Sequence, residues 1–398
     1  MGFLNPGDIS VNNIVLSGSK GVLDVTNQFQ SLSVLEDLMI PGMNASLVLL
    51  DSLNLQSMLP LIGEEILYIN YNTPSISGLS HTFAVSSMKD ASPASALKVR
   101  AYEIECIALE AFTNKTTLVS KSYNTTLDMV VNDLFENFLN SNKSLQTEAT
   151  QGIQKYIVTN ERPFDAINRI RKRSSSITNP SSSFLFFENQ RGYYYVTLES
   201  LFSQGIVASY TDSDIGADNF LTRNNFRTML GYNLPDVYDT ATKLGQGAFT
   251  STVKRLDLKS LLFSTQNESP SSGSNRSSSG FKGAMGGSGI SSFIPKDMFN
   301  PDTFIDKMIA PQRAFLAEVD QLKIHIKIFG DSSLTVGQQI GINIIVNDGS
   351  TGPRADNAQI SGNFVISKLH SMIFPIDVHP RYIQVIEGVN LGSSVDNS

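Results

Sequence analysis

An internal repeat is the feature that most constrains the fold of this chain. The stretch SLTVGQQIGINIIV (333–346) follows the pattern of MLPLIGEEILYINY (58–71), in which an apolar residue and a Gly precede two polar residues and an alternating apolar run. Further on, SGNFVISKL (361–369) follows the pattern of SHTFAVSSM (80–88). Alternation with a period of two predicts strands. The chain is therefore predicted to contain two related β domains.

The repeat also bears on a pair of adjacent acidic residues. Glu64 and Glu65 in the first copy align with Gln338 and Gln339 in the second. General acid–base catalysis needs carboxyl groups that titrate, and an amide cannot replace them. The pair is therefore predicted to be structural, at the solvated start of a strand that follows a Gly turn. The alternative is that one copy became an active site.

The remaining pattern predicts a mainly β chain with an α+β block in its middle. Residues 1–110 contain short runs of Val, Ile, Leu, Phe and Tyr separated by turn residues, which is typical of a barrel or a sandwich. Helical spacing of apolar residues begins at Leu127 and again after Pro163, and a hairpin follows at 183–198.

The second half begins with a segment that has little capacity to form a core. Residues 264–292 are rich in Ser and Gly, which predicts a flexible loop or linker. A short helix is predicted at 311–321 and a half-buried strand at 322–329. On that strand Lys323, His325 and Lys327 share one face, which is either an exposed face or a subunit interface.

Composition and motifs exclude several classes of protein. The formal net charge of −7 argues against a dedicated nucleic-acid binder. Cys106 is the single cysteine, so no disulfide can form within the chain, and a buried apolar role is predicted for it. We expect neither a signal peptide nor a transmembrane helix.

No catalytic residue, cofactor site or metal site is predicted. The histidines have no zinc-binding spacing, and neither a nucleophile elbow nor a phosphate-binding loop is present. Two carboxylate pairs remain candidates for an enzyme, Glu64 with Asp51 and Glu103 with Glu105.

A basic cluster at the end of the second predicted helix is a further candidate site. Its members are Arg169, Arg171, Lys172 and Arg173. Cations are favoured at a helix C-terminus, so a solvated helix end is one interpretation. The other is an electrostatic contact with an acidic neighbour or with nucleic acid.

The order of these segments resembles a known family. DSLNLQSMLPLIGEEILYINYNTP (51–74), NERPFDAINRIRKRS (160–174), SFLFFENQRGYYYVTLESL (183–201) and the repeat beginning at Leu334 carry the resemblance. They are similar to the baseplate hub proteins of contractile-tailed bacteriophages and to the hub part of type VI secretion spike proteins. The resemblance implies two related β-barrel domains, a lateral α+β domain and no catalytic residues.

The resemblance also implies an assembly. Three chains would form a homotrimeric ring that couples a six-fold tail tube to a three-fold central spike and contacts other baseplate proteins. DNA would pass through the ring without specific binding, which suits an acidic chain. The protein would be made in the host cytoplasm and reside in the virion tail baseplate, with no membrane insertion.

The implied domain boundaries divide the chain into five parts. The first barrel spans 1–110 and the lateral domain 111–205. The second barrel is split between 206–265 and 311–390, with 247–266 supplying early strands that match 27–52. The remaining parts are a Ser/Gly-rich insertion at 266–310 and a tail at 391–398.

Two alternative functions stay open. One is a tail-associated enzyme that degrades cell wall or polysaccharide, built on one of the carboxylate pairs. The other is the hub of a secretion spike, which a fused spike domain after residue 390 would favour.

Overall fold

A computed structural model gives the architecture of the chain. The residues that it describes are 6–51, 63–90, 100–212, 227–235, 251–257, 260–268, 290–295, 305–319, 322–346, 355–356, 360–375, 377–378 and 381–390. His379, the predicted tail and most of the Ser/Gly-rich segment lie outside these residues.

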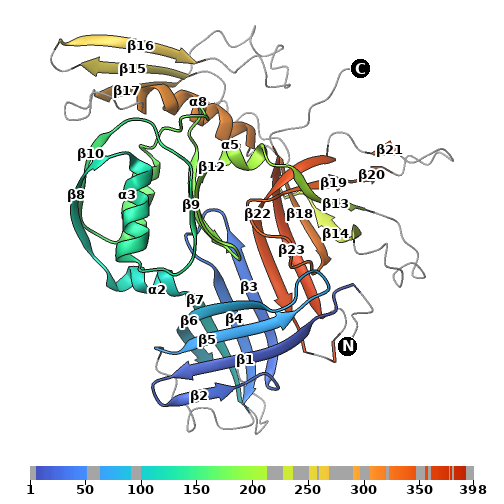
Figure 1. Cartoon of the computed structure of the whole chain (residues 1–398). Coiled ribbons are helices and arrows are strands. Elements are labelled where there is room, and N and C mark those ends of the chain that lie inside the picture. Colours follow the sequence, from blue (N-terminus) through green and yellow to red (C-terminus); the bar gives the residue numbers. More distant parts are fainter. Residues whose placement is uncertain are drawn as a thin grey trace.

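A 13-stranded sheet organises the described chain (Figure 1). One part of it comes from the N-terminal region. Its strands are β1 (Ser10–Gly18), β2 (Gly21–Asp24), β3 (Phe29–Asp37), β4 (Asn44–Asp51), β5 (Ile66–Asn72), β6 (Leu79–Asp90) and β7 (Arg100–Ala108). We call this part the first unit. Alternate side chains of these strands are buried in a first core, as the period-two pattern predicts, and Ile373 and Tyr382 from the C-terminal region also belong to it.

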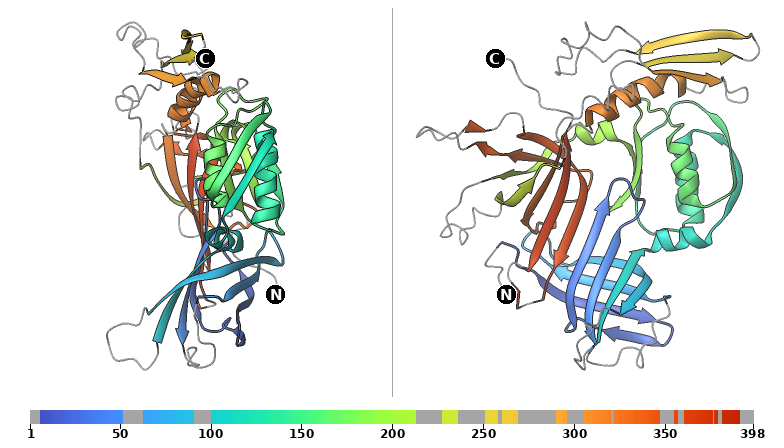
Figure 2. Two further views of the ribbon diagram at one scale, coloured as in Figure 1. Left: turned by 90° about the vertical axis from the view of Figure 1, so that its left-hand side faces the viewer. Right: turned by 180° about the vertical axis from the view of Figure 1, so that it is seen from behind.

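The other part of the sheet comes from the second half of the chain, and we call it the second unit. Its strands are β13 (Ile206–Thr211), β14 (Met229–Asn233), β18 (Leu322–Phe329), β19 (Gln339–Asn343), β22 (Gly362–Ile373) and β23 (Tyr382–Asn390). They surround a second core. Antiparallel pairing of β3 with β22 joins the two units, so that the blue and red strands of Figure 2 form one sheet.

A lateral block lies beside the sheet (Figure 2) and has a third core. Its elements are α2 (Leu109–Thr116), β8 (Val119–Thr125), α3 (Leu127–Asp133) with a π-helical turn at Leu134–Phe138, β9 (Leu145–Thr147), β10 (Gln154–Glu161), α4 (Pro163–Arg171), β11 (Phe184–Asn189), β12 (Gly192–Thr197) and α5 (Leu198–Phe202). Pro163 occupies the first turn of α4, and Phe164, Ile167 and Ile170 are buried, as predicted.

The lateral block and the second unit share a strand that is buried on both faces. In β11, Leu185 and Phe187 belong to the second core, while Phe184 and Phe186 belong to the core of the lateral block. Successive side chains of a strand point to opposite faces, so one apolar run serves two cores. The mainly β fold with a middle α+β block is confirmed.

The prediction that 247–266 supplies strands of the second barrel is wrong. β15 (Ser251–Asp257) and β16 (Leu262–Glu268) pair with each other and with β17 (Ile290–Pro295) in a separate three-stranded sheet. A short connection makes hairpin pairing cheaper in chain entropy than pairing with distant strands. The predicted helix at 311–321 is α8 (Ile305–Val319), and the short strands β20 (Ile345–Val346) and β21 (Ala355–Asp356) pair separately.

Gly330 offers a test of how closely the second unit is packed. It follows β18, and its N–H donates to the carbonyl of Tyr382 at 3.0 Å. A Cβ at Gly330 would overlap the ring of Tyr382, which is 1% exposed. We expect Gly330→Ala to lower the free energy of unfolding by about 1–3 kcal/mol, measured by urea denaturation.

The matched control is Gly205→Ala, where a Cβ would meet open space. Equal unfolding midpoints for the two variants would contradict the packing described at Gly330.

Candidate assembly interface

The two units have the same strand order. In the first unit neighbouring strands run β3-β4-β7-β6-β5-β1, and in the second β14-β18-β23-β22-β19-β13. One difference is that β1 lies antiparallel to β5 whereas β13 lies parallel to β19. The repeat seen in the sequence therefore extends over six strands, including strands whose sequences show no visible similarity.

A bulge occurs at the same place in both units. The register of β6 against β7 shifts between Val85 and Ser87, and that of β22 against β23 shifts between Ile366 and Lys368. A bulge is a specific feature at a defined position in a strand pair, so bulges at equivalent positions indicate equivalent strands. The shared bulge confirms that the downstream repeat at 80–88 and 361–369 aligns as predicted.

The upstream alignment is wrong by one residue. Phe83 pairs with Leu67, and the equivalent Phe364 pairs with Ile340, so Leu67 corresponds to Ile340. The sequence alignment placed Ile66 there, but Ile66 is 41% exposed and Ile340 is fully buried. The first unit has one extra residue after its Gly, and a shift of one residue moves every side chain to the other face.

This correction changes the meaning of the acidic pair. Glu65, not Glu64, corresponds to Gln338, because their carbonyls accept the N–H groups of the equivalent Val85 and Ile366. The solvated position predicted for the pair holds for Glu64 but is wrong for Glu65, which is 3% exposed, and for its counterpart Gln338.

The two buried side chains have the same local role. The Glu65 carboxylate accepts the N–H of Gly63 at 2.9 Å, and the Gln338 amide oxygen accepts the N–H of Thr335 at 3.0 Å. Gly63 has a φ of +90°, which a residue with a side chain rarely adopts. A carboxylate and an amide are interchangeable as acceptors here, which explains why Glu and Gln both serve.

The carboxylate of Glu105 faces the bulge of β6. Ser87 Oγ donates to Glu105 Oε2 at 2.6 Å, and Lys89 forms an ion pair with the other oxygen. The hydrogen bonds from Lys89 and from Ser87 lower the pKa of Glu105, and that from Lys89 has the larger effect. A general acid needs the opposite shift. Its predicted partner Glu103 instead accepts a hydrogen bond from Ser46.

The equivalent carboxylate in the second unit is Glu387, which lies beside the predicted basic face. It accepts hydrogen bonds from Ser367 Oγ at 2.8 Å and from Lys368 Nζ at 3.1 Å, and His325 Nε2 lies 3.3 Å away. Burial raises the pKa of Glu387, but these hydrogen bonds outweigh it and lower the pKa overall. His325 thus has a partner within the chain, whereas Lys327 is exposed.

The basic cluster at the end of α4 is divided. Arg169 forms an ion pair with Glu161 at 2.6 Å and donates to Tyr156 Oη at 2.7 Å, so it ties α4 to β10. Arg171 is half-buried, and burial lowers its pKa. Lys172 is exposed and Arg173 is half-buried at the end of the helix.

The join between the units contains a buried acid that the sequence did not reveal. Glu36 lies on β3 opposite Leu369 of β22, and its Oε2 accepts the N–H of Val336 at 3.1 Å. The residue is 5% exposed. Burial, with a smaller contribution from Glu188, raises the pKa of Glu36 to about 8, although the hydrogen bond from Val336 opposes the shift.

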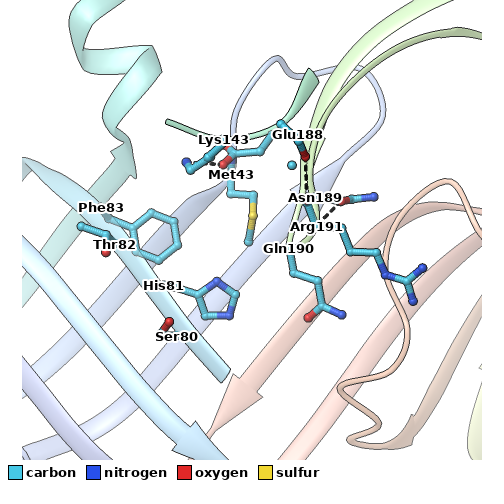
Figure 3. Close-up of a pocket in the computed structure, with 12 residues that line it drawn as sticks. Met43, Ser80, His81, Thr82, Phe83, Lys143, Glu188, Asn189, Gln190 and Arg191 are labelled. Atoms are coloured by element: carbon cyan, nitrogen blue, oxygen red, sulfur yellow. Dashed lines mark hydrogen bonds and ion pairs between the residues drawn. The ribbon is translucent and has the colours of Figure 1, made fainter. Parts of the chain in front are cut away.

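A polar cavity of about 240 Å³ separates β6 from the β11–β12 turn (Figure 3). At one end of it, Lys143 Nζ lies 2.5 Å from Glu188 Oε1 and 2.8 Å from Glu110 Oε2. The second oxygen of Glu188 accepts the N–H of Met43 at 2.8 Å. The cluster therefore connects the lateral block to the first unit.

The charges of this cluster are set by burial and by Lys143. Burial raises the pKa of Glu188 more than Lys143 lowers it. At Glu110 burial is the largest single influence and raises the pKa, but the attraction of Lys143 and the hydrogen bonds from Lys143 and Ser141 together outweigh it, so the pKa falls. His81 lines the same cavity, and burial lowers its pKa to about 4, so its imidazole is neutral at physiological pH. The Glu110–Lys143–Glu188 cluster thus holds the lateral block against the first unit.

Other candidate chemistry has little support. Burial raises the pKa of the Cys106 thiol to about 12, so the cysteine is an inert core residue. Within the described ranges, no group of three or more His, Cys, Asp or Glu is placed to hold a metal ion. In the same part of the chain, no helix has the length and apolar character needed to cross a membrane.

Sequence reasoning missed Glu36, Glu110, Lys143 and Glu188. Only Glu188 carried a local signal, because it ends the apolar run SFLFFE, in which a charge requires a partner. The partners come from distant segments, so no spacing in the sequence could identify them.

Removing Lys143 should destabilise the junction. Lys143→Ala would leave two carboxylates that are at most 5% exposed without their cation. We expect a loss of about 3–5 kcal/mol in the free energy of unfolding, measured by chemical denaturation. Lys172→Ala, at an exposed position, is the control and should change stability little. Equal stability of the two variants would count against the ion-pair cluster.

Glu36 should make stability depend on pH. Its folded-state pKa of about 8 lies above its ordinary value of 4.5, so the folded chain favours the protonated form. The contribution of Glu36 to the free energy of unfolding is complete below the pKa that it has in the unfolded chain. This contribution is lost as the pH rises through the pKa that it has in the folded chain. We expect the melting temperature to fall between about pH 5 and about pH 8.5, and Glu36→Gln to reduce this fall.

The control is Glu64→Gln, at an exposed position, which should keep the pH dependence of the unaltered chain. If Glu36→Gln retained the same dependence, the buried acid would not be its source.

Comparison with known proteins relates this architecture to tail proteins. No family model and no curated protein matches the chain. Among solved structures, a tail protein from Neisseria meningitidis MC58 matches 95% of this chain and 96% of its own with a TM-score of 0.57 at 10% identity. The 43 kDa tail protein of prophage MuSo2 from Shewanella oneidensis matches 95% of this chain and 98% of its own, with a TM-score of 0.58 at 9% identity.

Each match covers nearly the whole length of this chain and of the tail protein with which it is compared. The identities are too low to establish more than a shared fold. They confirm the predicted resemblance at that level, and the chain has the fold of phage tail proteins.

Proposed function

We propose that this chain is the structural baseplate hub of a contractile phage tail. Three copies form a ring that adapts a six-fold tail tube to a three-fold central spike and encloses part of the DNA conduit. The proposal rests on one observation: the chain contains two units that have the same strand order and together form one continuous sheet. Three chains with two equivalent units each present six similar surfaces to a tube while keeping three-fold symmetry for a spike.

The proposed domain division follows the units with one change. The first barrel comprises 1–110 and the lateral domain 111–205, as the sequence suggested. The second barrel comprises strands β13 and β14 together with 311–390, whereas β15 and β16 belong outside it.

The proposed contacts involve the exposed part of the predicted residues. Lys327 with Lys323 and His325 on β18, and Glu64 before β5, are proposed for contacts between subunits or with the tail tube and spike. Lys172, with its neighbours Arg171 and Arg173, is proposed for an acidic baseplate partner. Glu65 is left out because it is buried, and Arg169 because it ties α4 to β10.

A structural role is favoured over catalysis by the state of the carboxylates. Glu65 and Glu105 serve as hydrogen-bond and ion-pair partners, and the lowered pKa of Glu105 does not suit proton donation. The proposed location is the virion tail baseplate after synthesis in the host cytoplasm. A net charge of −7 is compatible with DNA passing through without being retained.

The test is the mass of the purified chain in solution, alone and with its presumed spike and tube proteins. Light scattering should give three times the chain mass of 43.5 kDa, with rings in negative-stain images. A strict monomer under every condition would contradict the proposal, and hydrolysis of glycans would then be assayed with Glu64→Gln and Glu105→Gln variants.

A further inference from the structure

The contact between the two units within one chain has a defined register. Along the second half of β22, Ser371 lies opposite Val34 and His370 lies opposite Leu35 of β3. β19 pairs with the first half of β22 only, through Val365. Two strands therefore follow one another along the same edge of β22, one from each unit.

Each of these two strands has an equivalent in the other unit. β14 is the counterpart of β3, because both carry a bulge at the same place, between Phe29 and Ser31 and between Met229 and Gly231. Counting from the bulge, Leu234 and Pro235 correspond to Val34 and Leu35.

The counterpart of β22 is β6. From their shared bulge, Lys89 corresponds to His370 and Asp90 to Ser371. The corresponding strands β14 and β6 are not neighbours in the sheet of one chain.

Both strands have an open edge among the residues that the structure describes. β14 is the last strand at its end of the large sheet, and an isolated bridge joins only Thr228, directly before it, to Thr211 at the end of β13. On the other strand, the ladder between β5 and β6 ends at Ala84, and the Val85 N–H still donates to the Glu65 carbonyl. The β6 residues from Ser86 to Lys89 have no described strand beside them on that side. An open edge with unused backbone groups is a template for a strand from another chain.

We propose that β14 of one copy pairs antiparallel with β6 of the next copy, in the register of β3 with β22. Leu234 then lies opposite Asp90, and Pro235 lies opposite Lys89. The inference rests on the proposed ring and specifies how it closes. Six similar joins alternate around the ring, three within chains and three between them, so the sheet has no open edge at these strands.

Pro235 tests whether this register is physically possible. In the join within the chain, Leu38 donates its N–H to the Ser367 carbonyl at 3.0 Å. Hydrogen-bonded pairs alternate along an antiparallel ladder, so the pair of Leu35 with His370 is a non-hydrogen-bonded one. A proline at the position equivalent to Leu35 therefore loses no bond to the neighbouring copy.

Exposure along β14 points the same way. Tyr232 is 43% exposed, whereas its counterpart Leu32 in the join within the chain is fully buried. An exposed aromatic side chain on an edge strand offers apolar surface that a strand from another chain can cover. A second copy on this edge would cover it.

A disulfide test distinguishes the two kinds of join. Lys89→Cys with Pro235→Cys is made in a Cys106→Ala background and oxidised at the concentration where light scattering gives the trimer. The two Cα atoms of a non-hydrogen-bonded pair lie about 4.5 Å apart, which a disulfide can span. We expect covalent dimers and trimers on a non-reducing gel, with no larger species because the ring is closed.

The matched control is Leu35→Cys with His370→Cys, the same register within one chain, which should form a disulfide at the chain mass. An off-register pair, Lys89→Cys with Gly231→Cys, should give no covalent trimer. A trimer in solution without the Lys89–Pro235 cross-link, or with equal cross-linking of the off-register pair, overturns this inference and leaves the ring intact. A chain that is monomeric throughout overturns both.

A second variant covers the case in which the cysteine chains do not fold. Tyr232→Asp alters a side chain that is exposed in the single chain, so its melting temperature as a monomer should not change. We expect it to shift the mass from three chains to one. Tyr68→Asp, at a 38% exposed position on β5, is the control and should remain trimeric. A trimeric Tyr232→Asp variant would contradict the proposed edge.

Discussion

The pairing of β3 with β22 is the interaction on which the rest of the structure depends. It converts two separately packed units into one sheet and sets their relative position through a register of six residue pairs. Strand pairing is well suited to this role, because a slip of one residue would turn the buried faces outward. Glu36 is buried beside this join at a cost in desolvation, which makes the pairing the natural place for stability to respond to pH.

A second constraint holds the lateral block against the sheet. Glu188 contacts Lys143 within the block and the backbone of Met43 in the first unit. Buried ion pairs contribute little net stability compared with apolar packing, yet breaking one is expensive, so they favour one arrangement over others. Together with β11, which is buried on both faces, this cluster orients the lateral block on the sheet.

Patterns of short range were predicted well from the sequence. The buried stripe of α4 and the alternation of β18 follow from local periods of 3.6 and 2 residues. The alignment of the repeat failed at Ile66, because a single inserted residue before β5 is invisible when both registers offer apolar residues at alternate positions. The charged residues at 36, 110, 143 and 188 were missed because their partners come from other segments.

The sequence by itself determined that the chain contains a duplicated β domain, is mainly β and is interrupted by an α+β block. These properties follow from the local periodicity of apolar residues and from the repeat. Only the tertiary structure decided which strands pair. β14 takes the place of β3 in the second unit, although the sequence pointed to 247–266. The physical reason is that hairpin strands joined by a short connection pair with each other at low entropic cost, whereas pairing between distant strands is selected by the packing of the whole core.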